Sequence, residues 1–165
     1  MMSETVDLDG VDIAYRSFTP LGHANSDSVP VMLVHGMGGD STTWDRFTRA
    51  LTAQGSRVIT VDLRGHGKSA HTSTYEFDSF GADLLALIDH LGLTEFDLVG
   101  HSLGGSPVSL AAQRRPQLVP RLGLEEPPLP VPPGHATPPL TAHRPSETAR
   151  GHAADQRLLL SRVAP

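Results

Sequence analysis

Ser102 stands in a Gly-x-Ser-x-Gly pentapeptide, GHSLG, at residues 100–104. An apolar run precedes the pentapeptide and a helix-forming segment follows it, so the pattern predicts a sharp strand-to-helix turn that needs small residues on either side of the serine. Such a turn raises the hydroxyl above the sheet edge as a candidate nucleophile, and the N–H of Leu103 faces the place where an oxyanion would form. An ordinary glycine-rich loop is the alternative, and the flanking strand and helix favour the turn.

A second glycine-rich segment, VHGMGGD at residues 34–40, ends another apolar run. Its glycines let backbone N–H groups approach a substrate carbonyl, and the amide of Met37 is the natural second oxyanion donor. A phosphate-binding loop is excluded because the Lys-Ser/Thr pair and its spacing are missing. A flexible turn that ends a strand is the alternative. His35 is predicted to organise this loop by packing and hydrogen bonding rather than to act as a ligand or base.

A third segment, DLRGHGKS at residues 62–69, also follows an apolar run, and it is predicted to form a tight structural loop near the site. We expect Asp62 and Arg64 to pair with loop backbone or with each other. His66 and His71 have no carboxylate or histidine four residues away on a predicted helix, the spacing that a helical metal site would use, so no metal is expected.

The three segments, in this order, resemble the α/β-hydrolase fold family, and most closely its esterase, epoxide hydrolase and cofactor-free haloperoxidase group. The resemblance covers residues 1 to about 126 and implies that Ser102 is the nucleophile, with the backbone amides of Met37 and Leu103 as the oxyanion hole. It implies pocket-lining positions for His35, Gly36 and His101. A serine at this place implies cofactor-free hydrolysis of small carboxylic esters or related acyl substrates. A cofactor-free peroxidase activity would use the same serine.

The base and the acid that would activate the serine are harder to assign. The histidines after the serine are His135, His143 and His152, and all lie in or beside a proline-rich stretch without a strand to hold them. Glu125 and Glu126 end the strand after the nucleophile helix, where either one is a candidate acid or a surface charge. Two readings follow: a serine hydrolase, or a truncated and catalytically incompetent fragment that at most binds a small molecule or a partner.

The elements that must position these residues alternate between strand and helix. Residues 5–18 alternate around Asp9-Gly10 and predict an antiparallel hairpin. Apolar runs that suit strands buried on both faces lie at 29–36, 57–65 and 96–102, with a last short strand at 122–124. Helices are predicted within 42–55, within 77–93 with Asp78 as N-cap and Gly92 as stop, and after Ser102. This pattern predicts an α/β fold with a mostly parallel sheet and an N-terminal antiparallel hairpin, incomplete at the C-terminus.

Length and composition limit the classes of protein to which this chain can belong. The chain has 165 residues, no cysteine and a formal net charge of −5, which argues against a nucleic-acid partner and against disulfides or thiolate sites. No apolar stretch is long enough for a membrane span, and the N-terminus lacks a signal sequence, so we expect a cytoplasmic protein. Residues 1–126 are predicted to form the core, and 127–165, with nine of the fourteen prolines, a disordered tail without a strand. The sequence does not indicate an oligomeric state.

Overall fold

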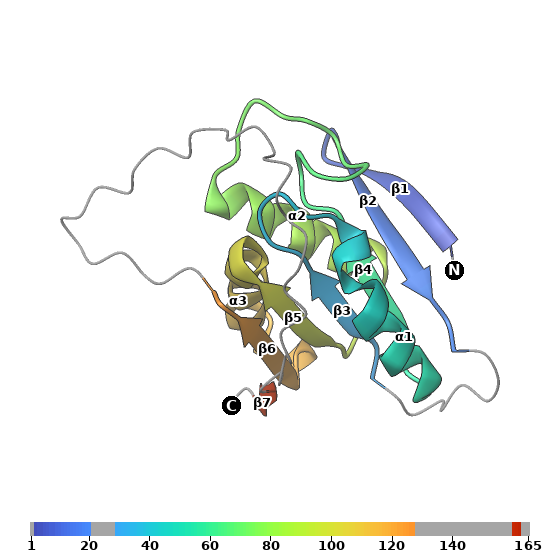
Figure 1. Cartoon of the computed structure of the whole chain (residues 1–165). Coiled ribbons are helices and arrows are strands. Elements are labelled where there is room, and N and C mark those ends of the chain that lie inside the picture. The colour runs from blue at the N-terminus through green and yellow to red at the C-terminus, as the bar shows by residue number, and fades with distance from the viewer. Residues whose placement is uncertain (1, 21–28, 128–159, 163–165) are drawn as a thin grey trace.

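A computed structural model describes residues 2–20, 29–127 and 160–162. These residues form a seven-stranded sheet in the order β1-β2-β4-β3-β5-β6-β7, flanked by helices (Figure 1). The strands are β1 Met2–Leu8, β2 Val11–Phe18, β3 Val31–Val34, β4 Val58–Val61, β5 Asp97–His101, β6 Arg121–Glu125 and β7 Leu160–Arg162. The α-helices are α1 Asp45–Ala53, α2 Phe77–His90 and α3 Gly105–Arg114, and the 3-10 helices are η1 Ser41–Trp44, η2 Ser102–Gly104 and η3 Pro116–Leu118.

The middle of the sheet is parallel and both of its sides are antiparallel. Strands β4, β3, β5 and β6 are parallel neighbours, so their carboxyl ends meet at one edge. Strand β2 runs antiparallel to β4 and forms the hairpin with β1. In the hairpin turn Asp9 and Gly10 have φ of 54° and 85°, which suits a type I′ turn. The predicted α/β class, mostly parallel sheet and N-terminal hairpin are therefore confirmed.

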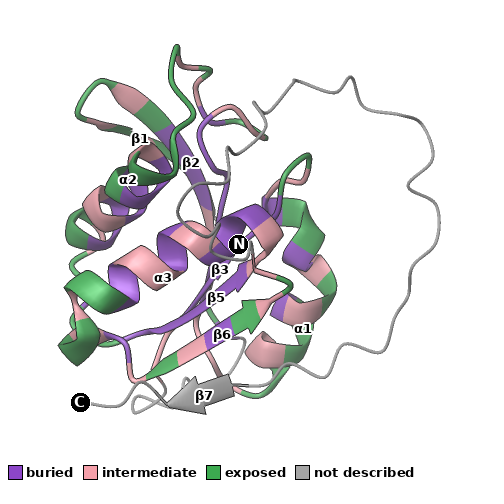
Figure 2. Ribbon diagram, turned by 90° about the vertical axis from the view of Figure 1, so that its left-hand side faces the viewer, coloured by how far each residue is buried: buried purple, intermediate pink, exposed green. Residues whose placement is uncertain are grey.

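Each central strand is buried on both faces, as its apolar run predicts. Met32 and Val34 of β3 face the larger core, which α2 and α3 cover, whereas Val31 and Leu33 face a smaller core that contains Trp44 beside α1. Figure 2 shows α2 and α3 on one side of the sheet and α1 on the other, with the most buried segments between them. This three-layer packing holds the carboxyl ends of β3, β4 and β5 in fixed positions relative to one another.

The predicted start of α2 needs correction. Asp78 was expected to cap α2, but the helix begins at Phe77 and its N-cap is Glu76, which makes no side-chain capping bond. Asp78 lies in the first turn instead, where its carboxylate interacts favourably with the helix dipole. The predicted stop is confirmed, because Gly92 follows the helix with φ of 60°.

The predicted tail contains a strand that the sequence pattern did not indicate. Residues of β7 pair antiparallel with Arg121–Gly123 of β6. Three residues are too few to show a two-residue period, so the pattern could not reveal this strand. The rest of the tail, including His135, His143 and His152, lies outside the described residues. Among the described helices, none combines the length and the apolar character that crossing a membrane requires.

Candidate functional site

Ser102 occupies a left-handed backbone conformation directly after β5. Its φ is 47°, a region that costs a residue with a side chain about 1–2 kcal/mol. The two flanking glycines are required by close approaches: a Cβ on Gly100 would lie 2.4 Å from the carbonyl oxygen of Gly104, and one on Gly104 would lie 2.5 Å from that of Val34. Strain at a serine that neighbouring backbone holds in place is typical of a functional corner.

The second glycine-rich segment packs directly against this corner. A Cβ on Gly36 would lie 3.1 Å from the Cβ of Ser102 and 2.7 Å from Nδ1 of His101, so these three residues meet. The N–H of Gly39 donates to the carbonyl of Gly36 at 3.1 Å, which closes a tight turn, and the intervening Met37 is 58% exposed. The predicted pocket residues Gly36 and His101 therefore do lie beside the serine, with Met37 on the adjoining turn.

His35 is fully buried, and both of its ring nitrogens are engaged. The N–H of Leu63 can only donate, so Nε2, at 3.1 Å, is the acceptor, and Nδ1 carries the proton that it donates to the carbonyl of Gly36 at 2.7 Å. Burial lowers the pKa of His35, and the bond to Gly36 opposes that shift less strongly. The ring therefore stays neutral and ties the loop after β3 to the loop after β4. This is the organising role that the sequence predicts.

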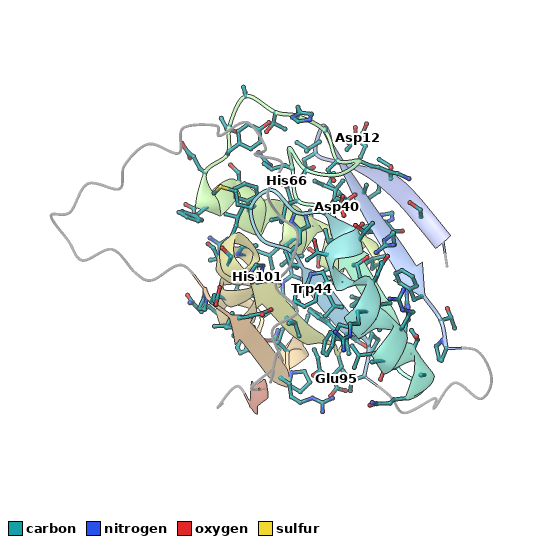
Figure 3. All side chains as sticks on the ribbon, in the orientation of Figure 1. Asp12, Asp40, Trp44, His66, Glu95 and His101 are labelled. Carbon is teal, nitrogen blue, oxygen red and sulfur yellow. The ribbon has the colours of Figure 1, made fainter. Side chains whose placement is uncertain are left out.

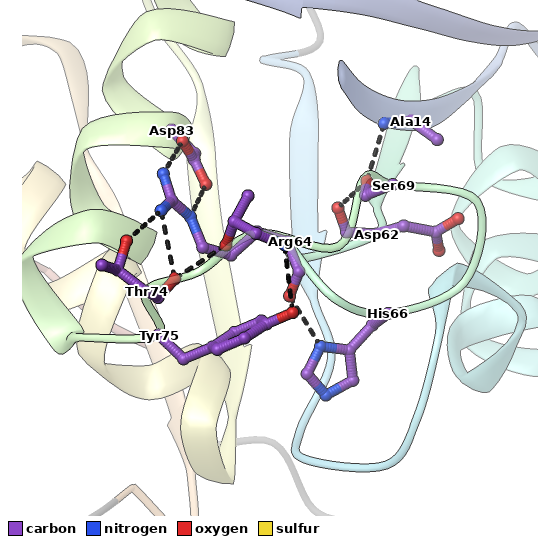
Figure 4. A network of polar contacts seen from close by, with 9 residues as sticks. Ala14, Asp62, Arg64, His66, Ser69, Thr74, Tyr75 and Asp83 are labelled. Atoms are coloured by element: carbon purple, nitrogen blue, oxygen red, sulfur yellow. Dashed lines mark hydrogen bonds and ion pairs between the residues drawn. The ribbon is translucent and has the colours of Figure 1, made fainter. Parts of the chain in front are cut away.

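The loop after β4 is built around two charged residues that do not pair with each other. Asp62 accepts from the backbone N–H groups of Ser41 at 2.6 Å and Lys68 at 3.0 Å. Arg64 forms a buried two-pronged ion pair with Asp83 of α2, both contacts being 2.6 Å, as Figure 4 shows. Of the two expected arrangements, loop backbone is thus correct for Asp62, and Arg64 also donates to the loop carbonyl of Thr74 at 3.3 Å. The main partner of Arg64 was missed, although a carboxylate on the buried face of an apolar helix signals that a cation lies opposite.

The candidate acids lie one strand away from the corner. Glu125 stands opposite His101 in the β5–β6 register and is half-buried, and Glu126 is exposed with φ of 45°. Among the described residues neither carboxylate has a hydrogen-bond or ion-pair partner. Glu125 thus lies beside the end of β5, the strand that leads to Ser102. No contact among the described residues indicates a role for either glutamate.

Within the described part of the chain, no imidazole is hydrogen-bonded to the hydroxyl of Ser102. Figure 3 shows Asp40, His66 and His101 toward the carboxyl ends of the central strands, with Glu95 at the opposite end. His66 contacts the carbonyl of Arg64 through Nδ1 at 3.0 Å, and its ring centroid is 5.1 Å from that of His35. No cluster of three possible metal ligands occurs among the described residues. The geometry therefore offers a strained serine and nearby backbone donors, without an assigned base.

Comparisons with known proteins agree with this arrangement. The family model described as "alpha/beta hydrolase fold" matches residues 29–160. The sn-1-specific diacylglycerol lipase ABHD11 of Mus musculus is 34% identical over 120 residues, which are 72% of this chain and 38% of that protein. The bifunctional esterase/perhydrolase DCH of Acinetobacter calcoaceticus is 33% identical over 66% of this chain and 38% of its own length.

A solved structure gives the same result. The thioesterase domain from the curacin biosynthetic pathway superposes with a TM-score of 0.70 at 30% identity, covering 79% of this chain and 48% of that domain. The chain spans between a third and two fifths of the length of the two curated relatives named above. The residues matched by the family model, 29–160, include both glycine-rich loops and the serine corner.

Proposed function

The chain belongs to the α/β-hydrolase fold family, and from that premise we propose that it hydrolyses small carboxylic esters or related acyl substrates with Ser102 as nucleophile. The observation that carries the proposal is the backbone of Ser102, held at φ of 47° between two glycines that tolerate no Cβ. This geometry presents the hydroxyl above the carboxyl edge of the sheet, where a substrate can reach it.

The reaction follows from the groups around that hydroxyl. Oγ of Ser102 attacks the ester carbonyl while a base removes its proton, and the carbonyl oxygen becomes an oxyanion. The backbone N–H groups of Met37 and Leu103 are proposed to donate to this oxygen. Collapse breaks the bond to the alkoxide, which leaves as the alcohol after taking the proton. Water then repeats the sequence on the acyl-serine and releases the carboxylic acid.

Two features support Met37 and Leu103 as the donors. Leu103 is the second residue of η2, which begins at Ser102 and leads directly into α3, so its amide lies in the first turn of a helical segment, where N–H groups lack intrahelical partners and the dipole favours negative charge. Met37 lies in the turn closed by Gly36 and Gly39, and Gly36 contacts Ser102. The relatives named above include a lipase and an esterase, which supports ester substrates.

Labelling with a fluorophosphonate tests the proposal, because this probe reacts appreciably only with an activated serine. The purified full chain is incubated with the probe and its intact mass is measured, beside a Ser102→Ala variant as control. One adduct on the parent chain and none on the variant is the expected result. A folded parent chain that gains no adduct would show that no base reaches Ser102, and the alternative of a non-catalytic binding protein would replace the hydrolase.

A further inference from the structure

The loop that carries Met37 is held at its C-terminal end by two charged residues, the buried Asp62 and the largely buried Arg16. Both backbone groups of Ser41, the residue after this loop, are engaged. Its N–H donates to Oδ1 of Asp62 at 2.6 Å, and its carbonyl accepts from Nη2 of Arg16 at 2.6 Å. A carboxylate and a guanidinium thus each form a hydrogen bond with the backbone of Ser41.

Arg16 is itself fixed in place on β2. The same Nη2 also donates to Asp45 at 2.6 Å, Nε donates to the hydroxyl of Thr60 at 3.2 Å, and the guanidinium lies 5.0 Å from the ring centroid of Phe18. Only 13% of the Arg16 side chain is exposed, so both protons of Nη2 have partners in a largely desolvated place. Charge-assisted hydrogen bonds of this kind are stronger than neutral ones and hold a defined geometry.

Asp62 is fixed as firmly from the other side. Its second carboxylate oxygen accepts from Lys68, its N–H donates to the carbonyl of Ala14 at 2.9 Å, and its own carbonyl accepts from the hydroxyl of Ser69 at 2.6 Å. Figure 4 shows Ser69 bridging Asp62 and Ala14. A Cβ on Gly67 would lie 2.4 Å from the Asp62 carboxylate, so the loop wraps tightly around it. Asp62 is therefore a rigid anchor.

Together with the hydrogen bonds of His35, these contacts hold both ends of the loop in place. His35 fixes the first end through Gly36 and Leu63, and the grip on Ser41 fixes the second. Five residues, 36–40, lie between the two anchors, and their turn is exposed at Met37. A loop this short between fixed ends has few backbone conformations, so the direction of its amides is set before a substrate arrives.

We infer that Arg16 and Asp62 are positioning residues that orient the Met37 amide for the oxyanion by fixing Ser41. The inference rests on the proposed function for its catalytic consequence, but the grip on Ser41 can be measured without it. Neither side chain touches the substrate in this scheme. Oxyanion donors contribute because they are aligned in advance, and a shift of about 1 Å in such a group costs up to about a hundred-fold in rate.

Arg16→Gln is the informative variant, because it removes the charged fork from a half-exposed ion pair while leaving Asp62 in place. We expect the rate constant of fluorophosphonate labelling to fall about ten-fold or more, since misaligned donors weaken the transition state. With a short-chain ester, kcat should fall while KM changes less than two-fold. Arg16→Lys retains one donor toward Ser41 and should recover part of the rate. Arg115→Gln, which removes a surface ion pair with Asp89, is the matched control and should label at the parent rate.

Hydrogen exchange separates this inference from the proposed function. In the full-length chain, the peptide covering residues 36–44 should exchange faster in Arg16→Gln than in the parent or in Arg115→Gln, whether or not the parent is labelled. If exchange in this peptide is unchanged, the grip on Ser41 does not hold the loop and the inference is wrong. If exchange rises but folded Arg16→Gln labels at the parent rate, Arg16 stabilises the loop without positioning the donor. A parent chain that is not labelled refutes the proposed function and the catalytic part of the inference together, leaving only the mechanical part.

Discussion

Replacing Ser102 by glycine should make the protein more stable, although it removes the proposed nucleophile. The residue has φ of 47°, where a side chain costs about 1–2 kcal/mol and glycine is free of that cost. Ser102→Ala keeps a Cβ and therefore keeps the strain. The two variants lose the same hydroxyl, which has no hydrogen-bond partner among the described residues. Their difference in stability therefore reports the backbone strain, reduced by the greater freedom of glycine in the unfolded chain.

The magnitude follows from two opposing terms. Relief of the strain contributes about 1–2 kcal/mol, and the greater freedom of glycine in the unfolded chain takes back about 0.5–1 kcal/mol. The net gain of Ser102→Gly over Ser102→Ala is thus about 0–1.5 kcal/mol, with a midpoint of about 0.75 kcal/mol. For a chain of 165 residues this midpoint corresponds to a rise in Tm of roughly 1.5–3 °C.

Thermal unfolding and urea titration of the two variants give the comparison. Asp9→Gly is a useful calibration, because Asp9 has φ of 54° in the β1–β2 turn, where no function is proposed. A Ser102→Gly protein that is less stable than Ser102→Ala, while Asp9→Gly is stabilised, would refute the reasoning. It would mean that the corner is relaxed and that its geometry carries no sign of function.

Two further predictions concern the surroundings of the corner. Gly104→Ala should destabilise the protein by about 1–3 kcal/mol or prevent folding. The new Cβ would meet the backbone carbonyl oxygens of Val34 and His35, which cannot move aside. An unchanged midpoint of urea unfolding would contradict this prediction. The lowered pKa of His35 means that the unfolded chain binds a proton before the folded chain does, so stability should fall as the pH drops below about 6.5, by at most about 1.4 kcal/mol per pH unit. Urea titrations between pH 7.5 and 5 should show a shallower fall in His35→Gln than in the parent, and equal slopes would show that His35 is not the responsible group.

The sequence predicts the backbone of this site better than its charged supports. Glycine spacing, apolar runs and turn residues act over a few neighbouring positions, so the corner at Ser102, the turn at Met37 and the hairpin at Asp9 were all expected where they occur. The partners of Arg16 and the ion-pair partner of Arg64 were not predicted. Arg64 reaches Asp83, nineteen positions along the chain, and Arg16 reaches Ser41, twenty-five positions along. A long side chain can pair with any carboxylate or carbonyl that the fold brings near, and no local pattern specifies which.

The short strand β7 and the cap of α2 were missed for a different reason. A three-residue strand exists because the edge of β6 offers unpaired backbone groups, and that depends on the edge rather than on the residues that fill it. At the start of α2, Asp78 is a favourable residue in the first turn as well as a good cap, so both positions were compatible with its chemistry.

Substitutions at this site are expected to have two kinds of effect, according to whether they replace a glycine in a close contact or a charged residue that supports the loop. The glycines at 100 and 104 are required by close approaches to backbone carbonyls, and the glycine at 36 by the side chains of His101 and Ser102, so a Cβ at any of the three disturbs the corner. The charged residues act indirectly. Arg16 and Asp62 form hydrogen bonds with Ser41, and Ser41 follows the loop that contains Met37. We expect that weakening such a support leaves the sheet intact and acts on the rate mainly through the alignment of the amide. Substitution of the charged residues is therefore expected to lower the reaction rate while the protein stays folded. Substitution of the glycines is expected to lower both the rate and the stability of the fold.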